Sequence, residues 1–106
     1  HHPTEIDAVH QAVRELYPGK KILAVFQPHL FSRTRDFAAG FGESLTAFDE
    51  VILLDIYPAR ELPIEGITSS WLLEKISNPN KKLVAKEDLI SCLKKADADV
   101  YLTIGA

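Results

Sequence analysis

The sequence has 106 residues, of which 46% are hydrophobic and 25% are charged, and its formal net charge is −3. This length suits one globular domain with a real core and leaves no room for a second domain. No apolar run approaches the ~20 residues of a membrane span, and the mildly acidic balance argues against a general nucleic-acid or membrane binder, which would need a broad basic face.

The first predicted helix starts at Pro3, which suits a first helical turn, and ends before the pair Pro18-Gly19. Its apolar residues recur at helical spacing: Ile6, Val9, Val13 and Leu16. The run KILAVFQ, residues 21–27, follows as a short buried strand that Pro28 ends. The amphipathic helix therefore leads directly into an apolar strand.

A second helix is predicted from near Ser32 to about Phe48. Its buried stripe consists of residues four apart: Phe37, Phe41 and Leu45. Gly40 and Gly42 each weaken such a helix by ~1 kcal/mol relative to Ala, so we expect close packing against a neighbour to explain them. The run EVILLDIY, residues 50–57, is the second strand, and the loop PARELPIEG, residues 58–66, follows it.

The last third of the chain predicts two more helices and two more strands. Thr68 or Ser69 caps a helix that carries Leu72, Leu73 and Ile76, and residues 78–82 end it. Residues 83–85 form a short strand, residues 86–98 form a helix, and residues 99–106 form the final strand. One face of that last helix holds Leu89, Cys92, Leu93 and Ala96. Cys92 is the only cysteine, which indicates a reducing compartment and a small apolar core residue rather than a nucleophile.

This alternation predicts an α/β domain with a Rossmann-like, open, mostly parallel sheet and helices on both faces. In such sheets ligands bind beyond the carboxyl ends of the strands. The segments QPHLFSRTR, DIYPARE and IGA follow or end the predicted strands. Because the chain starts in an apparent ligand loop and stops on an apolar strand, we expect residues 1–106 to be a single domain excised from a longer protein.

The segment FQPHLFSRTRDF, residues 26–37, places cations where a strand passes into a helix. If Ser32 is the N-cap, Arg33 and Arg35 lie in the positive first turn, which would favour them only with an anion docked there. Arg33 is the better candidate because it is nearer His29. The alternative is that Arg33 pairs with Asp36 and Arg35 is merely solvated, and the residues alone do not separate the two.

Two further side chains at the strand ends have both a binding and a structural interpretation. His29 could hydrogen-bond an anionic ligand or shuttle a proton, or it could be satisfied by backbone carbonyls. Asp55 could contact a ligand, although a loop cap is the favoured reading. Glu61 and Glu65 are interpreted as loop charges.

No metal or nucleotide motif is present in the sequence. His1 and His2 are adjacent but lack further ligands at a metal-binding spacing. There is neither a G-x-x-x-x-G-K-[ST] loop nor a G-x-G-x-x-G turn, so nothing here could cradle a triphosphate alone. We therefore expect no metal or cofactor in this chain.

Four segments, HHPTEI, VFQPHLFSRTRDF, VILLDIYPARE and PIEGITS, together resemble the C-terminal domain of the Mur ligases of bacterial peptidoglycan synthesis. The resemblance covers essentially the whole chain, in order. The sequence FQPH followed by SRT is similar to the branch that adds L-alanine. The branch that recycles murein tripeptide shares the HHPT-type start but normally differs at this point.

The resemblance implies a cytoplasmic, three-domain, ATP-dependent ligase that joins L-alanine to UDP-N-acetylmuramate through an acyl phosphate. ATP and Mg²⁺ would be bound mainly by the central domain, so this chain alone would be inactive. The C-terminal domain would close over the other two and contact the amino acid. The alternatives are the tripeptide-recycling ligase and a non-catalytic α/β binding module, and no nucleic-acid or membrane partner is expected.

By resemblance, His1, His29 and Arg33 lie on the L-alanine side, and no residue of this chain is assigned a certain catalytic role. Additional candidates for this site are Ser32, Arg35 and Asp55. One departure is Leu30, which stands where many members have Arg. The other is that an Asp and an aromatic residue usually found just before HHPTE are missing from this sequence, as is the Gly-rich turn that usually continues IGA.

Overall fold

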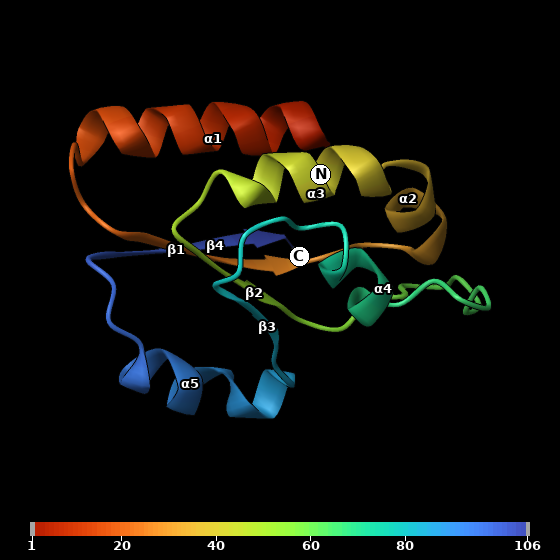
Figure 1. Cartoon of the computed structure of the whole chain (residues 1–106). Coiled ribbons are helices and arrows are strands. Elements are labelled where there is room, and N and C mark those ends of the chain that lie inside the picture. The colour runs from red at the N-terminus through yellow and green to blue at the C-terminus, as the bar shows by residue number, and fades with distance from the viewer. Residues whose placement is uncertain (1, 106) are drawn as a thin grey trace.

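The computed structural model describes residues 2–105, in which helices and strands alternate around one sheet (Figure 1). The helices are α1 (Pro3–Leu16), α2 (Phe31–Asp36), α3 (Ala38–Thr46), α4 (Ser69–Leu73) and α5 (Leu89–Lys95), and a short 3-10 helix, η1 (Lys86–Asp88), precedes α5. The strands are β1 (Ile22–Gln27), β2 (Glu50–Leu53), β3 (Lys81–Leu83) and β4 (Val100–Gly105). No helix within residues 2–105 is long and apolar enough to cross a membrane.

The four strands form one parallel sheet in the order β3-β2-β1-β4. In the central register, Val25 of β1 lies opposite Ile52 of β2 and Thr103 of β4. Since every strand runs in the same direction, all carboxyl ends meet at one edge, which is where ligands bind in open α/β sheets. The predicted α/β class and parallel sheet are confirmed.

The central strand β1 is buried on both faces because helices cover both. α1 and α3 lie over one face and α5 lies over the other (Figure 1). The first core cluster contains Ile22, Ala24 and Phe26 of β1, packed with Ile6, Phe41, Leu45, Phe48, Leu72 and Ile76 among others. The second contains Leu23, Val25, Ile52 and Leu54. Leu89, Cys92 and Leu93 of α5 pack against it, as does Ala96 directly after the helix. Cys92 is half-buried there, as expected for a small apolar residue.

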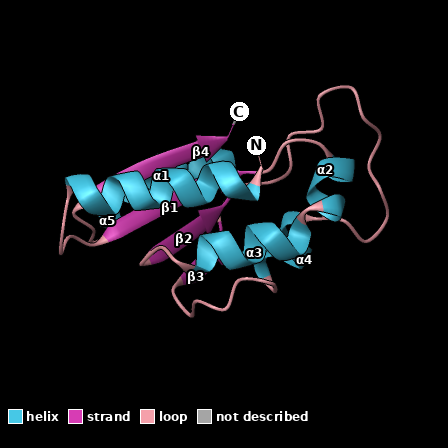
Figure 2. Cartoon of the chain, turned by 90° about the horizontal axis from the view of Figure 1, so that it is seen from above, coloured by secondary structure: helices cyan, strands magenta, loops and turns pink. Residues whose placement is uncertain are grey.

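The predicted helix over residues 32–48 is wrong in its continuity, because α2 and α3 are separate helices that meet at Phe37. Phe37 has φ −114° and ψ 15°, outside the helical range, and it ends α2 and begins α3. The break allows Phe41 and Leu45 to pack on the sheet while α2 lies beyond the strand ends (Figure 2). Phe37 remains half-buried against the same core.

The predicted bounds of β2 and β3 move by a few residues, whereas one of the two predicted caps of α4 is confirmed. β2 ends at Leu53, not at Tyr57, and β3 occupies Lys81–Leu83 because Val51 N–H pairs with the Asn80 carbonyl, 2.9 Å away. Thr68 is the cap of α4, with its hydroxyl oxygen accepting from Trp71 N–H at 3.1 Å. Ser69, the other predicted cap, is the first helical residue instead.

Gly40 and Gly42 allow the close packing that the sequence predicts. A Cβ atom at Gly42 would lie 2.5 Å from the backbone carbonyl oxygen of Lys75, and one at Gly40 would lie 2.7 Å from Cγ of Pro3. Both distances are shorter than real carbon contacts. The glycines of α3 thus let the chain after α4 and the start of α1 approach the helix closely.

Replacing Gly42 with Ala should destabilise the fold despite the better helix propensity of Ala. The propensity gain is ~1 kcal/mol, whereas overpacking a filled site costs ~1–3 kcal/mol, and the obstructing atom is backbone that cannot rotate away. Urea unfolding followed by circular dichroism should show a lower midpoint for Gly42→Ala. The exposed neighbour Glu43→Ala is the control and should change stability by less than ~0.5 kcal/mol; a Gly42 variant as stable as this control would contradict the packing argument.

Candidate functional site

The loops that follow β1 and β2 are joined by two backbone hydrogen bonds beyond the strand ends. Tyr57 N–H donates to the Pro28 carbonyl and Leu30 N–H donates to the Tyr57 carbonyl, each at 2.8 Å. These bonds form an isolated parallel bridge between His29 and Tyr57. Leu30 then adopts φ 70°, in the left-handed region that non-glycine residues rarely occupy, immediately before α2. The site therefore rests on a rigid extension of the sheet.

His29 is oriented by its partner in this bridge. Its ring stacks on the Tyr57 ring, with centroids 5.6 Å apart and planes inclined by 20°. Tyr57 is 47% exposed, so the pair lies at the surface rather than in the core. His29 thus lies just beyond the carboxyl end of β1, as predicted, and its role in ligand binding stays a prediction.

Arg33 and His2, which lies at the amino-terminal end of the chain, both contact Phe37. The Arg33 guanidinium carbon is 5.8 Å from the Phe37 ring centroid, and the His2 ring meets the same ring edge-on at 4.8 Å. His2 also caps α1, where its Nδ1 accepts from Thr4 N–H at 3.1 Å. The predicted site residue His1 lies outside the described residues.

Ser32, the candidate N-cap of α2, is instead the second helical residue, and Leu30 occupies the N-cap position without a side-chain hydrogen bond. Both Ser32 groups contact Glu61 instead: the backbone N–H donates to Oε1 at 2.9 Å, and the hydroxyl donates to Oε2. The position predicted for an external anion at the start of α2 is therefore occupied by a carboxylate of this chain. Reading Glu61 as a plain loop charge was wrong.

The environment of Glu61 favours its ionised form. The Ser32 hydroxyl is the main group that lowers the pKa of this carboxyl, and the backbone N–H groups of Ser32 and Phe31 act in the same direction. Slight desolvation opposes them, while the charge of Arg35 adds to the lowering. Ionised Glu61 is thus the form that binds the first turn of α2.

Arg35 and Asp55 occupy more peripheral positions. Arg35 Nε donates to Asp36 Oδ1 at 2.9 Å, and both side chains are about half exposed, so Arg35 is not merely solvated. Asp55 is exposed, and its backbone carbonyl accepts from the Gln27 side chain at 3.4 Å. Gly105, in the terminal segment IGA, pairs with Gln27, which brings the third predicted segment to the same edge of the sheet.

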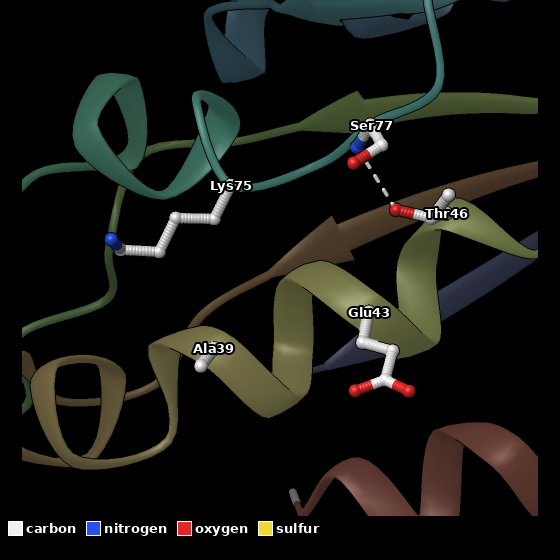
Figure 3. Close-up of a pocket in the computed structure, with 5 residues that line it drawn as sticks. All are labelled: Ala39, Glu43, Thr46, Lys75 and Ser77. Atoms are coloured by element: carbon white, nitrogen blue, oxygen red, sulfur yellow. Dashed lines mark hydrogen bonds between the residues drawn. The ribbon is translucent and has the colours of Figure 1, made fainter.

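Within residues 2–105, no three His, Cys, Asp or Glu side chains gather closely enough to hold a metal ion. Figure 3 shows a pocket between α3 and the segment after α4, lined by Ala39, Glu43, Thr46, Lys75 and Ser77. There Thr46 Oγ1 accepts from Ser77 N–H at 3.0 Å. None of the predicted site residues lines this pocket, so it is separate from the cationic edge of the sheet.

A parallel α/β domain with His and Arg side chains on the segments that follow its strands is typical of a ligand-binding domain. The whole chain, residues 1–106, matches the family described as "Mur ligase, glutamate ligase domain". The chain therefore belongs to the Mur ligase family, which confirms the resemblance seen in its motifs.

Several relatives align with this chain over its full length. It is 76% identical to a protein of Flavobacterium johnsoniae, 74% identical to one of Flavobacterium psychrophilum and 59% identical to one of Cytophaga hutchinsonii. Each is named UDP-N-acetylmuramate–L-alanine ligase. In each case all of this chain aligns, but it spans only 24%, 24% and 23% of those relatives.

The pKa of Glu61 provides a direct test of its contact with Ser32. Because this pKa lies below the ordinary value of 4.5, the contact should stabilise the fold above that pH and be lost as pH falls through the lower folded-state pKa. An NMR titration of the Glu61 side-chain carboxyl should show a midpoint below 4.5, and Ser32→Ala should move it back toward 4.5. A midpoint that Ser32→Ala leaves unchanged would mean that the hydroxyl does not hold the carboxylate.

Proposed function

We propose that this chain is the C-terminal domain of a bacterial cytoplasmic ligase that joins L-alanine to UDP-N-acetylmuramate in peptidoglycan synthesis. The observation that carries the proposal is 76% identity, over all 106 residues, to a relative of that name. The full enzyme would use ATP and form an amide bond through an activated carboxyl group. In this proposal residues 1–106 form one domain of three.

In the proposed reaction this domain supplies the L-alanine side of the site. Arg33 would bind the substrate carboxylate, for which a guanidinium is well suited because it offers paired N–H donors. His29 would lie near the reacting groups and His1 would complete the amino-acid contacts. Support comes from the shared contact of Arg33 and His2 with Phe37, which brings α2 beside the residue that follows His1.

The residues of this chain do not fit ATP or Mg²⁺ as a resident site. The described residues hold no metal-binding cluster, and the sequence has no phosphate-binding glycine loop. Nucleotide and metal would therefore be bound mainly by the rest of the enzyme. The contribution of this domain would be to orient the amino acid and, on closing, to keep water away from the activated carboxyl group.

The full-length protein that contains this chain should release phosphate from ATP only when both UDP-N-acetylmuramate and L-alanine are present. Parallel assays with glycine and L-serine would define the amino-acid specificity. An assay with the murein tripeptide would separate this ligase from the recycling branch. Turnover with the tripeptide but not with L-alanine would overturn the proposal. The 106-residue chain alone should release no phosphate above background, since the other substrates would be bound elsewhere.

In the full-length enzyme, Arg33→Ala should raise the KM for L-alanine and lower kcat. A charge-assisted hydrogen bond contributes ~1.5–3 kcal/mol, so kcat/KM should fall by roughly 10- to 150-fold. Lys94→Ala is the matched control, because Lys94 is an exposed cation on α5, which covers the face of the sheet opposite α1 and α3. Unchanged kinetics in Arg33→Ala would mean that this guanidinium does not hold the substrate.

A further inference from the structure

Helix α2 lacks a cap of its own. It has six residues, and the residue at its N-cap position, Leu30, makes no side-chain bond to the first turn. The first N–H groups of any helix need acceptors from outside the helix, and so short a helix is marginal by itself. The conformation of α2 must therefore be fixed by residues outside it.

Glu61 supplies the missing acceptors from 29 residues away in the sequence. Its two carboxylate oxygens take both the backbone N–H and the hydroxyl of Ser32. The backbone N–H of Phe31, the first residue of α2, acts on the same carboxylate. One side chain thus accepts from both hydrogen-bond donors of Ser32, in the first turn of the helix.

The segment that carries Glu61 is itself held in place. It begins at Tyr57, which is hydrogen-bonded to the loop after β1 on both sides. Glu61 N–H then donates to the Pro58 carbonyl at 2.9 Å, across a turn in which Ala59 adopts φ 53°. Glu61 therefore lies on a hydrogen-bonded turn that is attached to the bridge between the loops after β1 and β2.

Arg33 directly follows Ser32 in the same turn of α2, so the direction of its side chain depends on where that turn is held. Its guanidinium lies against Phe37, the residue that also contacts His2. A 1 Å displacement of a positioning group can reduce catalysis on the order of 10²-fold. Loss of the Glu61 contact would free the first turn and, with it, Arg33.

We propose that Glu61 is a positioning residue that acts through Arg33, by fixing the first turn of α2 so that the guanidinium is aligned for the carboxylate of L-alanine. This inference rests on the function proposed above. Glu61 does not touch the substrate in this scheme, and its effect should pass entirely through the helix that it caps.

The test is a double-mutant cycle in the full-length enzyme with Glu61→Ala, Arg33→Ala and the pair. Glu61→Ala should raise the KM for L-alanine about five- to tenfold, as expected for the loss of one or two hydrogen bonds, and leave the KM values for ATP and UDP-N-acetylmuramate unchanged. In the Arg33→Ala background the same change should add less than about twofold, because the two residues act as one unit. Glu65→Ala, an exposed carboxylate in the same loop, is the control and should behave as wild type.

Glu61→Gln tests the geometry separately, because the amide can still accept from Ser32 N–H and donate to its hydroxyl. This variant should stay within about threefold of wild type in the KM for L-alanine; a Gln variant as impaired as Ala would contradict positioning by these hydrogen bonds. If Glu61→Ala does not fold, Ser32→Ala takes its place in the cycle with a smaller expected rise in KM.

Independent, multiplicative effects of Glu61 and Arg33, or an equal rise in KM for all three substrates, would overturn the proposal in favour of a general structural role. Failure of the proposed function looks different, since the wild-type enzyme would then not ligate L-alanine at all. The wild-type assay thus separates the two before any variant is measured.

Discussion

The arrangement of the site depends on the pairing of β1 with β2 beyond the ends of both strands. Tyr57 exchanges two 2.8 Å hydrogen bonds with Pro28 and Leu30, so the two loops leave the sheet in a fixed register. Backbone bonds of this kind are insensitive to side-chain identity but depend on the loop path. They place His29, the start of α2 and the Glu61 segment relative to one another before any ligand is present.

This constraint explains how a mildly acidic domain presents cations at one edge. Arg33 and Arg35 fall in the last turn of the six-residue helix α2, the end at which the helix dipole favours cations. Carboxylates of this chain complete the arrangement, with Glu61 bound to the first turn and Asp36 paired with Arg35. Arg33 lies against the Phe37 ring, with its guanidinium carbon 5.8 Å from the ring centroid.

The sequence predicted the fold well because the strands are apolar and the helices are amphipathic. The core helices, the packing of Cys92 and the close approach at Gly42 all follow from local spacing or from residue size. The break at Phe37 was missed because the stripe of apolar residues four apart begins at Phe37 itself, and no Gly or Pro in residues 31–37 marks a helix end. Only packing against the sheet separates α2 from α3.

The site was predicted in part, for a related reason. His29 and Arg33 stand out because they follow a strand, and their motif resembles a known family. Glu61 and Tyr57 carry no such local signal, since their partners lie 29 and 28 residues away and the contact depends on the parallel register of β1 and β2. The motif DIYPARE contains both residues, so its resemblance to the family was the one available indication.

Leu30 shows how chemistry and backbone can be separated at a single position. Its left-handed conformation is imposed by the bridge to Tyr57, and any residue with a Cβ atom meets nearly the same steric penalty there. The main chain would thus treat Leu and another side chain unbranched at Cβ, such as Arg, alike. A cation could therefore replace the apolar group of Leu30 without rebuilding the turn, so the chemistry presented beyond β1 can change while the backbone path stays the same.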